Sequence, residues 1–461
     1  MLNRYIGDKA FYRRVLTIAL PIIAQNAITN FVSLLDNIMV GQVGTLEMSG
    51  VSIVNSLIFV FNLCIFGGAS GAGIYVSQYF GSGDHSGIRY AFRYKMLLCL
   101  LFSLFGIGIF TFGGDALIGL YLQGEGAAAD IAATALFGKE YLGVMLWGLV
   151  PFALSNAYSG TLRECGQTMV PMLSGVIAVL VNLFLNYTLI FGHFGAPVMG
   201  VSGAALATVI SRYVELAIVV IWTHCNEKKL PFVKGVFRSF RIPGKLVWLI
   251  TLSSLPMLLN EALWSAGEST LVQIFSTRGL DVVPAVNISS TVLNLCNVAV
   301  LSMGSTIAII MGQMQGAGES SETLWTTFRR ICFATVAGGI GCGILLASVS
   351  GLFPMLYNTT EAVRHLSTEM ILICAAQIPL VAYIHQIYFT IRSGGKTGIT
   401  FLYDSGFSWL VMIPVTYCVC KFTSLSIVWV FLVSRATYIL KCIFGYFFLK
   451  KGTWIRNLTQ Q

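Results

Sequence analysis

Residues 78–83 read Gln-Tyr-Phe-Gly-Ser-Gly, and residues 313–318, 235 positions later, read Gln-Met-Gln-Gly-Ala-Gly. The same offset places Pro21 on Pro256, and a leucine precedes each of these prolines. The alignment needs no gap over about seventy residues. A repeat of this length indicates that the chain contains two related halves.

The repeat continues at slightly shorter offsets towards the end of each half. Residues 162–168 match residues 391–397, and Arg212 matches Arg435, with a serine before each arginine. These matches extend the relationship over most of the chain. We therefore expect each half to fold in the same way.

The composition excludes most classes of soluble protein. Of the 461 residues, 56% are hydrophobic and only 10% are charged, whereas soluble chains carry about a quarter charged residues. Too few charges remain to solvate a disordered chain, a coiled coil or the basic surface of a nucleic-acid-binding domain. We expect lipid to surround most of this chain.

The apolar segments have the length of membrane helices. A bilayer core requires about 20 predominantly apolar residues per helix. Twelve segments meet this requirement: residues 15–40, 51–76, 96–113, 136–159, 169–191, 204–223, 246–275, 285–311, 331–356, 370–391, 398–420 and 425–449. The fold class predicted is an all-α integral membrane protein with twelve transmembrane helices in two parallel-repeat, six-helix lobes.

The basic residues indicate the orientation. Of the 28 Lys and Arg residues, 21 lie in alternate segments: residues 1–14, 77–95, 160–168, 224–245, 312–330, 392–397 and 450–461. Cytoplasmic loops carry the excess of positive charge in membrane proteins. We therefore expect a multi-pass protein of the inner or plasma membrane with both termini in the cytoplasm.

The predicted organisation is an N-terminal lobe over residues 1–223, a basic cytoplasmic linker over 224–245 and a C-terminal lobe over 246–461. Six spans per lobe give both lobes the same orientation, as in secondary transporters that bind substrate between repeats. No G-x-x-x-x-G-K-[ST] motif occurs. Any uphill transport should therefore be driven by an ion gradient.

Pro21 and Pro256 lie inside the first helix of each half. Proline removes a backbone hydrogen bond and bends a helix. Two interpretations stay open, a static kink and a hinge whose bend changes during transport. Recurrence in both halves favours the hinge.

Acidic residues inside the predicted spans need a partner or a function, because an ionised carboxylate in a bilayer costs a few kcal/mol or more. Glu215 follows Arg212 by three residues, and we interpret these two as a structural ion pair, although a transport role fits as well. The full set of such acids is Asp36, Glu215, Glu261, Glu268 and Asp404.

Asp36 has no basic residue nearby in the sequence. Asn182 and Asn186 are one helical turn apart, and with Thr208 they are predicted to reach the same depth as Asp36. One carboxylate, two amide oxygens and a hydroxyl suit a hard cation such as Na⁺, and a carboxyl in a partly dry pocket is also suited to hold a proton. Interhelical hydrogen bonds that only join the bundle are the alternative, which fits the asparagines better than Asp36.

The second half offers a second candidate site for protonation or for a cationic substrate. Glu268 follows Glu261 by seven residues, so both point from one helix face, and their repulsion favours protonation of one of them. His385 could relay protons, but a lone histidine more often packs as a satisfied polar residue.

Several motifs, taken together, resemble the multidrug and toxic compound extrusion (MATE) transporters. They are Leu20-Pro21, residues 36–41 (Asp-Asn-Ile-Met-Val-Gly), residues 78–84, residues 200–208, residues 310–313 and residues 316–319. The resemblance covers essentially the whole chain. It implies a V-shaped pair of six-helix bundles around a central cavity, which exchanges a proton or sodium ion for organic cations by alternating access.

The resemblance also implies roles for particular residues. Asp36 matches the family's first-helix aspartate, and Asn182 and Thr208 match positions around it. Asn186 stands where DinF-like relatives carry a second aspartate, which puts the ion preference in doubt. Where the NorM-like branch has an aspartate on its tenth helix, this chain offers Gln377 and His385. Glu261 also lies nearer its proline than the corresponding glutamate of that branch.

The sequence thus predicts a cation-coupled exporter of organic cations or drugs. We expect no cofactor beyond the coupling ion, H⁺ or Na⁺, and no metal beyond Na⁺ at Asp36. The expected partners are small cationic substrates and membrane lipids, with no nucleic acid, and the protein is expected to be a monomer.

Three other classes of membrane protein fit the sequence less well. A lipid-linked saccharide flippase of the same superfamily should hold its diphosphate with several deep basic residues, but only Arg212 and Arg435 are deep here. A major-facilitator exporter should carry an acidic and basic signature that is missing from residues 77–95. A non-transporting receptor or scaffold needs neither unpaired intramembrane acids nor a repeat. We find no catalytic constellation and do not expect an enzyme.

Overall fold

The computed structural model describes residues 4–122 and 127–460, except for the side chains of residues 32–34. Within these ranges it has 12 helices that are long and apolar enough to cross a membrane, and it has no β-strand. This confirms the predicted all-helical membrane fold with twelve spans. Residues 1–3, 123–126 and 461 of the predicted lobes lie outside the described residues.

The first half contains α1 (Lys9–Gly41), α2 (Thr45–Ser82), α3 (His85–Tyr121), α4 (Ala128–Glu164), α5 (Met169–Phe191) and α6 (Gly200–Cys225). The second half contains α7 (Gly244–Ser276), α8 (Val282–Gly316), α9 (Ser321–Val349), α10 (Glu361–Ser393), α12 (Ile413–Phe422) and α13 (Ile427–Lys450). The eleventh span, Thr397–Phe422, is composite: α11 (Thr397–Phe401), two π-helical segments, η5 (Leu402–Gly406) and η6 (Ser408–Met412), and then α12. Short 3₁₀ helices are η2 (His193–Gly195), η3 (Pro231–Val233) and η4 (Phe353–Leu356).

Most helices extend beyond the predicted spans. The third span was predicted over residues 96–113, whereas α3 covers His85–Tyr121. Hydropathy marks only the part in the hydrocarbon core, while the helix continues into the polar interface with its backbone hydrogen bonds satisfied. The predicted end of the ninth span, residue 356, was wrong: α9 ends at Val349, because Gly351 and Pro354 interrupt the helix.

The contacts between residues divide the chain into two compact units. Unit 1 comprises Met1–Ile23, Ser77–Gly83 and Leu255–Gln461, and unit 2 comprises Ala24–Val76 and Asp84–Ser254. Three helices, α1, α2 and α7, therefore contribute to both units.

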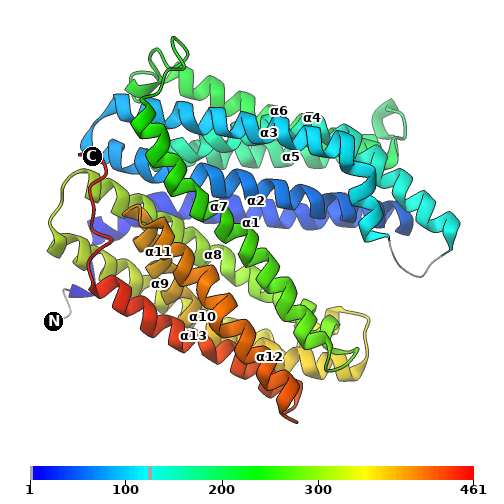
Figure 1. The fold of residues 1–461 in the computed structure, drawn as a ribbon. Helices are drawn as coiled ribbons and strands as arrows, with labels where there is room; N and C mark the ends of the chain where they lie inside the picture. The colour runs from blue at the N-terminus through cyan, green and yellow to red at the C-terminus, as the bar shows by residue number, and fades with distance from the viewer. Residues whose placement is uncertain (1–3, 123–126, 461) are drawn as a thin grey trace. The chain divides into compact units, whose positions relative to one another are not determined.

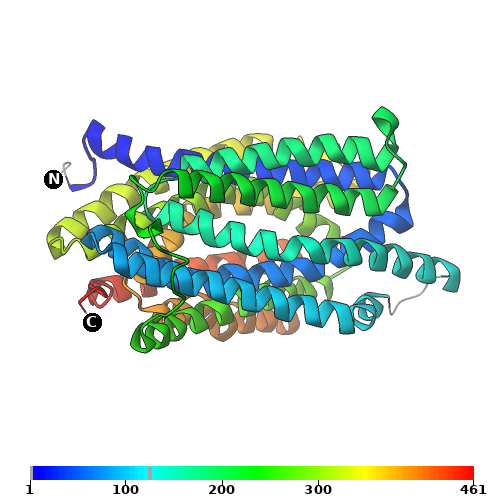
Figure 2. The same ribbon diagram turned by 90° about the horizontal axis from the view of Figure 1, so that it is seen from above.

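In unit 2, α4 packs against α3 and α6, and α5 packs against α6. Figures 1 and 2 show these helices side by side, coloured from blue to green. Small residues permit the close packing, as in other membrane helices. A Cβ atom on Gly50 of α2 would lie only 2.8 Å from the backbone nitrogen of Gly138 on α4. Bulkier residues at Gly50 should therefore push these helices apart.

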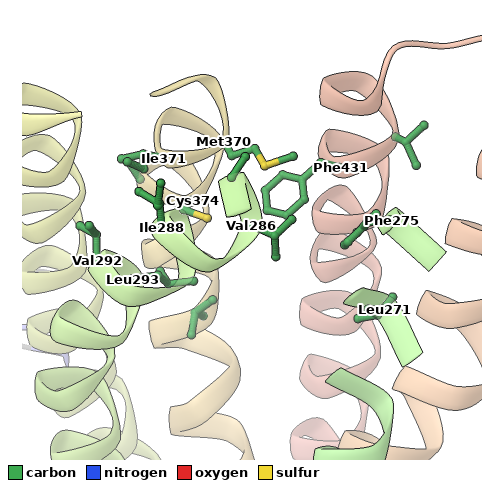
Figure 3. Packing of buried hydrophobic residues seen from close by; sticks show 14 of the residues in the cluster. Leu271, Phe275, Val286, Ile288, Val292, Leu293, Met370, Ile371, Cys374 and Phe431 are labelled. Carbon is green, nitrogen blue, oxygen red and sulfur yellow. The ribbon is translucent and has the colours of Figure 1, made fainter. Parts of the chain in front are cut away.

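In unit 1, α10 packs against α8, α9 and α13. One apolar cluster joins α7, α8, α10 and the last two membrane helices, and Figure 3 shows part of it around Leu271, Phe275 and Phe431. A second cluster includes Val15 and Ile18 of α1, together with residues of α8, α9 and α10. The start of α1 is thus part of the core of unit 1.

The two copies of the repeated motif meet inside unit 1. The Gln78 side-chain nitrogen donates to the Gln315 side-chain oxygen at 3.1 Å. Gln78 also accepts from the Leu458 backbone N–H at 2.7 Å, and Gln315 donates to the Trp454 carbonyl at 3.2 Å. Trp454 is fully buried. Hydrogen bonds therefore join the segment that follows α13 to the ends of α2 and α8.

The segment predicted as a basic linker, residues 224–245, is an ordered part of unit 2. The Arg93 Nε group on α3 donates to the Val236 carbonyl at 2.7 Å, and Arg89 Nε donates to the Phe232 carbonyl at 3.0 Å. Phe232 and Val236 are both 2% exposed. These contacts hold the segment against α3.

Both prolines lie inside continuous helices, Pro21 in α1 and Pro256 in α7. The chain passes between the two units just after Ile23 and again just after Ser254. Each proline is therefore within three residues of a crossing point. Their predicted role as hinges stays a prediction.

Candidate functional site

The four residues predicted to form the cation site come together in unit 2. Asp36 lies near the end of α1, Asn182 and Asn186 lie on α5, and Thr208 lies on α6. The Asn186 side-chain nitrogen donates to Asp36 Oδ1 at 2.6 Å. Asn182 is 5% exposed and Asn186 is 1% exposed. A buried polar cluster therefore surrounds one face of the Asp36 carboxylate.

Asn182 links Asp36 to Thr208. In one orientation of the Asn182 amide, both its nitrogen and its oxygen form hydrogen bonds. The nitrogen then donates to Asp36 Oδ1 at 2.9 Å. The oxygen then accepts from the Thr208 hydroxyl at 3.3 Å. The Thr208 hydroxyl also lies 3.1 Å from the Ala204 carbonyl of its own helix. The cluster thus connects α1, α5 and α6 by side-chain hydrogen bonds.

One oxygen of the cluster has no hydrogen-bond partner among the described residues. It is Asn186 Oδ1, which is buried. A buried oxygen without a protein partner is able to accept a hydrogen bond from water or to bind a cation. Together with the carboxylate and the Thr208 hydroxyl, it provides oxygen ligands of the kind that hard cations prefer. The described residues contain no group of three or more His, Cys, Asp or Glu side chains suited to a metal ion.

Arg212 is the basic residue whose charge acts on Asp36. It is paired elsewhere: its Nη1 lies 3.2 Å from a carboxylate oxygen of Glu215, and its guanidinium lies 5.1 Å from the centre of the Phe152 ring. Within the described part of the chain, Asp36 makes no ion pair.

The two glutamate candidates of the second half are Glu261 and Glu268, both on α7. Glu261 lies in the field of Arg392 and Asp404, whereas the charge of Glu268 acts on Arg435. The two glutamates therefore have different basic neighbours. Their proposed roles in protonation or substrate binding stay predictions.

His385 and Gln377 lie on α10. His385 Nδ1 is 2.8 Å from the Val381 carbonyl one turn earlier, and the ring stacks near Phe389. This contact satisfies one ring nitrogen within the helix itself. Gln377 is 5% exposed, and its side-chain oxygen has no partner among the described residues.

An ion pair that was not predicted lies in unit 1. Lys441 Nζ on α13 is 2.7 Å from Asp404 Oδ1 in η5. The Asn260 side chain of α7 donates to the other oxygen of Asp404 at 3.0 Å. The sequence places both residues inside predicted spans, 398–420 and 425–449, but sequence periodicity does not pair residues on different helices. The packing of the helices brings both partners of Asp404, Lys441 and Asn260, to it from distant parts of the chain.

The matching family model, MatE, covers residues 21–188 and 256–418. Among curated relatives, the chain is 23% identical to a probable multidrug resistance protein NorM of Thermotoga maritima, over 96% of this chain and 93% of that protein. It is also 23% identical to a probable multidrug resistance protein YoeA of Bacillus subtilis, over 97% and 96% of the two chains.

Solved structures show the same fold. A crystal structure of MATE in complex with MaL6 matches with a TM-score of 0.85 at 17% identity, over 95% of this chain and 96% of that one. A crystal structure of MATE in the bent conformation matches with a TM-score of 0.84 at 18% identity, over 98% of both chains. The likeness therefore extends over nearly the whole length of these chains.

Proposed function

The chain belongs to the MATE family of membrane transporters, and on this premise we propose that it exports organic cations or drugs in exchange for H⁺ or Na⁺. Its curated relatives carry names of multidrug resistance proteins, which supports this class of substrate. The protein is a multi-pass membrane protein, which we place in the inner or plasma membrane with both termini in the cytoplasm.

One observation carries the proposal, namely the Asp36 cluster. A carboxylate within a membrane helix is costly unless a positive charge compensates it. Asn182 and Asn186 donate hydrogen bonds to Asp36 but supply no charge. A sodium ion or a proton supplies it when bound, and the charge is exposed again when the ion leaves.

Arg212 gives a physical route from ion binding to the rest of the bundle. When a cation neutralises Asp36, Arg212 interacts mainly with Glu215, its partner at 3.2 Å. When the cation leaves, the restored charge of Asp36 attracts Arg212 more strongly. Ion release thereby changes the balance of forces on α6, which carries both Arg212 and Glu215.

Alternating access requires a bend that can change. Pro21 lies within α1, fifteen positions before Asp36 on the same helix, and near the crossing between the two units. We propose that occupancy of Asp36 alters the bend of α1 at Pro21. Pro256 would act in the same way on α7.

The experiment is gradient-driven transport by the purified protein in inverted vesicles or proteoliposomes. Proton and sodium gradients are imposed separately, and uptake of a fluorescent cationic dye is followed. We expect at least one gradient to drive uptake in the wild type, and Asp36→Asn to abolish it.

Asp115→Asn is the matched control, because Asp115 is an exposed aspartate paired with Lys139 at 2.7 Å. It should transport like the wild type. Undiminished driven uptake by Asp36→Asn would refute the assignment of Asp36. Absence of uptake under both gradients in the wild type would refute ion exchange, and would leave the flippase and scaffold alternatives.

A further inference from the structure

The Asp404–Lys441 pair is an ion pair enclosed by membrane helices. The two charged atoms are 2.7 Å apart, and the exposed fractions of the side chains are 22% for Asp404 and 6% for Lys441. Removing two charges from water costs several kcal/mol per ion, and apolar residues of similar size are often no less stable. Stability alone is thus a weak reason for this pair.

Both oxygens of Asp404 are occupied. Oδ1 contacts Lys441, and Oδ2 accepts from Asn260 at 3.0 Å. Asn260 is 2% exposed and is fixed in turn by Ser405, whose hydroxyl donates to the Asn260 side-chain oxygen at 2.8 Å. The carboxylate is therefore held in a polar setting built from three helical segments.

The backbone is unusual at this point. Asp404 and Ser405 lie in η5, and a second π-helical segment, η6, follows after one residue. π-Helical turns are rare and occur frequently at functional sites. Here the turn presents consecutive residues, Asp404 and Ser405, to one asparagine on α7.

The ammonium group of Lys441 is placed where a free cation would be expected. It sits on the carboxylate and lies 5.4 Å from the centre of the Tyr403 ring and 5.8 Å from that of Phe407. Carboxylate and aromatic faces together are a typical setting for an ammonium ion. The Tyr403 hydroxyl is buried and has no partner among the described residues.

Other titratable groups whose charges interact with Asp404 are His385, Glu261, Tyr388, Tyr403 and Tyr438. His385 is held by the Val381 carbonyl, and Glu261 has Arg392 nearby. Within the described residues, only Lys441 forms an ion pair with Asp404. Of the charged neighbours of Asp404, Lys441 therefore interacts with it most strongly.

We propose that Lys441 is a resident cation, which occupies the Asp404 carboxylate and keeps the coupling ion off it. Lys441 then determines how many ions the protein binds, because without it Asp404 becomes one additional site for Na⁺ or H⁺. This inference rests on the proposed ion exchange at Asp36.

The test is the number of ions bound per protein. Bound ²²Na⁺ is counted at about pH 8, well above the ordinary pKa of a carboxyl group. Protons released when Na⁺ is added are counted near neutral pH, so that a protonated Asp404 is also detected. We expect Lys441→Met to bind one more Na⁺, or to release one more proton, than the wild type.

Three companion variants complete the design. Asp36→Asn should bind one ion fewer than the wild type, and Asp36→Asn with Lys441→Met should return to the wild-type number. Asp404→Asn with Lys441→Met should also bind the wild-type number. Lys139→Met is the matched control, since it breaks an exposed ion pair of the same 2.7 Å length and should add no ion.

An unchanged count in a folded Lys441→Met protein overturns the inference. An unchanged count in Asp36→Asn overturns the proposed function instead, so the two failures are distinguishable. If Lys441→Met does not fold, the melting temperature of Lys441→Ala is measured instead. It is compared in NaCl, in methylammonium chloride and, as the reference salt of equal ionic strength, in tetramethylammonium chloride. A rise in melting temperature that Asp404→Asn removes supports the inference, and equal melting in all three salts overturns it.

Discussion

Asp36 and Asp404 are two aspartates in membrane helices, each bound by an asparagine from another helix. Asn186 donates to Asp36 at 2.6 Å, and Asn260 donates to Asp404 at 3.0 Å. The difference is the lysine: Asp404 has Lys441 at 2.7 Å, whereas Asp36 has no ion pair within the described residues. The chain thus supplies a counter-charge for Asp404, and we propose that a bound cation supplies one for Asp36.

The two regions are not equivalent by the internal repeat. The offset of 235 aligns Asp36 with Leu271, and the offset that joins Arg212 to Arg435 aligns Thr208 with Phe431. Leu271 and Phe431 are each 1% exposed and belong to the apolar cluster in Figure 3. The place of the polar cluster in the first half is therefore filled by hydrophobic core in the second.

The polar centre of the second half lies elsewhere along the repeat. Asn260 aligns with Gln25, which precedes Asp36 by eleven residues, or about 16 Å of helix. Gln25 is paired with Arg163, whose Nη2 donates to it at 2.7 Å. One fold thus carries an aspartate without an ion pair among the described residues in one half, and an ion-paired aspartate at a position of the repeat that is not equivalent in the other half.

The largest expected effect separates activity from stability at Asp36. Asp36→Asn should abolish gradient-driven efflux and leave the melting temperature unchanged or higher, because it removes an uncompensated buried charge. Dye transport and thermal unfolding of the same preparation check both parts. A large fall in melting temperature would mean that Asp36 serves the structure rather than the ion.

The opposite result is expected at the other aspartate. Asp404→Asn leaves the Lys441 ammonium buried without a counter-charge, which should cost about 3–5 kcal/mol. Asp404→Asn with Lys441→Met should recover most of this loss, as a double-mutant cycle will show. Asp115→Asn, in an exposed pair, should cost no more than about 1 kcal/mol. Equal losses of stability in Asp404→Asn and Asp115→Asn would contradict the buried, uncompensated charge expected for Lys441.

Asn186→Asp should increase the difference between the Asp36 cluster and the Asp404–Lys441 pair, because it adds a negative charge beside Asp36. A second carboxylate beside Asp36 adds negative charge and should strengthen cation binding by about 1.4 kcal/mol. This free energy corresponds to about a tenfold higher affinity, or to one pKa unit for a bound proton. Sodium or proton binding measured by calorimetry checks this. Asn186→Leu should weaken binding, and a gain in affinity from that variant would contradict a ligand role.

The smallest effect is expected at Thr208. Thr208→Val removes one hydroxyl from the cluster, which should weaken ion binding by about 1 kcal/mol, or roughly fivefold. Thr188→Val is the matched control, because among the described residues the Thr188 hydroxyl donates only to the Phe184 carbonyl of its own helix. Ion affinities of the two variants should differ, and equal affinities would remove Thr208 from the site.

Sequence reasoning reached the Asp36 cluster but not the Asp404 pair. Asn182 and Asn186 are one turn apart, so helical periodicity alone places them on one face. Asp404 and Lys441 are 37 positions apart on separate helices, and π-helical turns decide which way Asp404 points. No local rule predicts that rotation. For the same reason the docking of residues 232 and 236 on α3 and the burial of Trp454 were not predicted.

The sequence by itself determined the twelve spans, the two related halves and the isolation of Asp36 from nearby bases. These features follow from the hydropathy of each segment, the internal repeat and the positions of the charged residues. All three can be read along the chain without knowing which distant residues meet. Tertiary structure alone decided which buried charges meet, because helix rotation and packing bring distant residues within hydrogen-bonding distance. That is why Asp404 is paired with Lys441, whereas Asp36 makes no ion pair within the described residues.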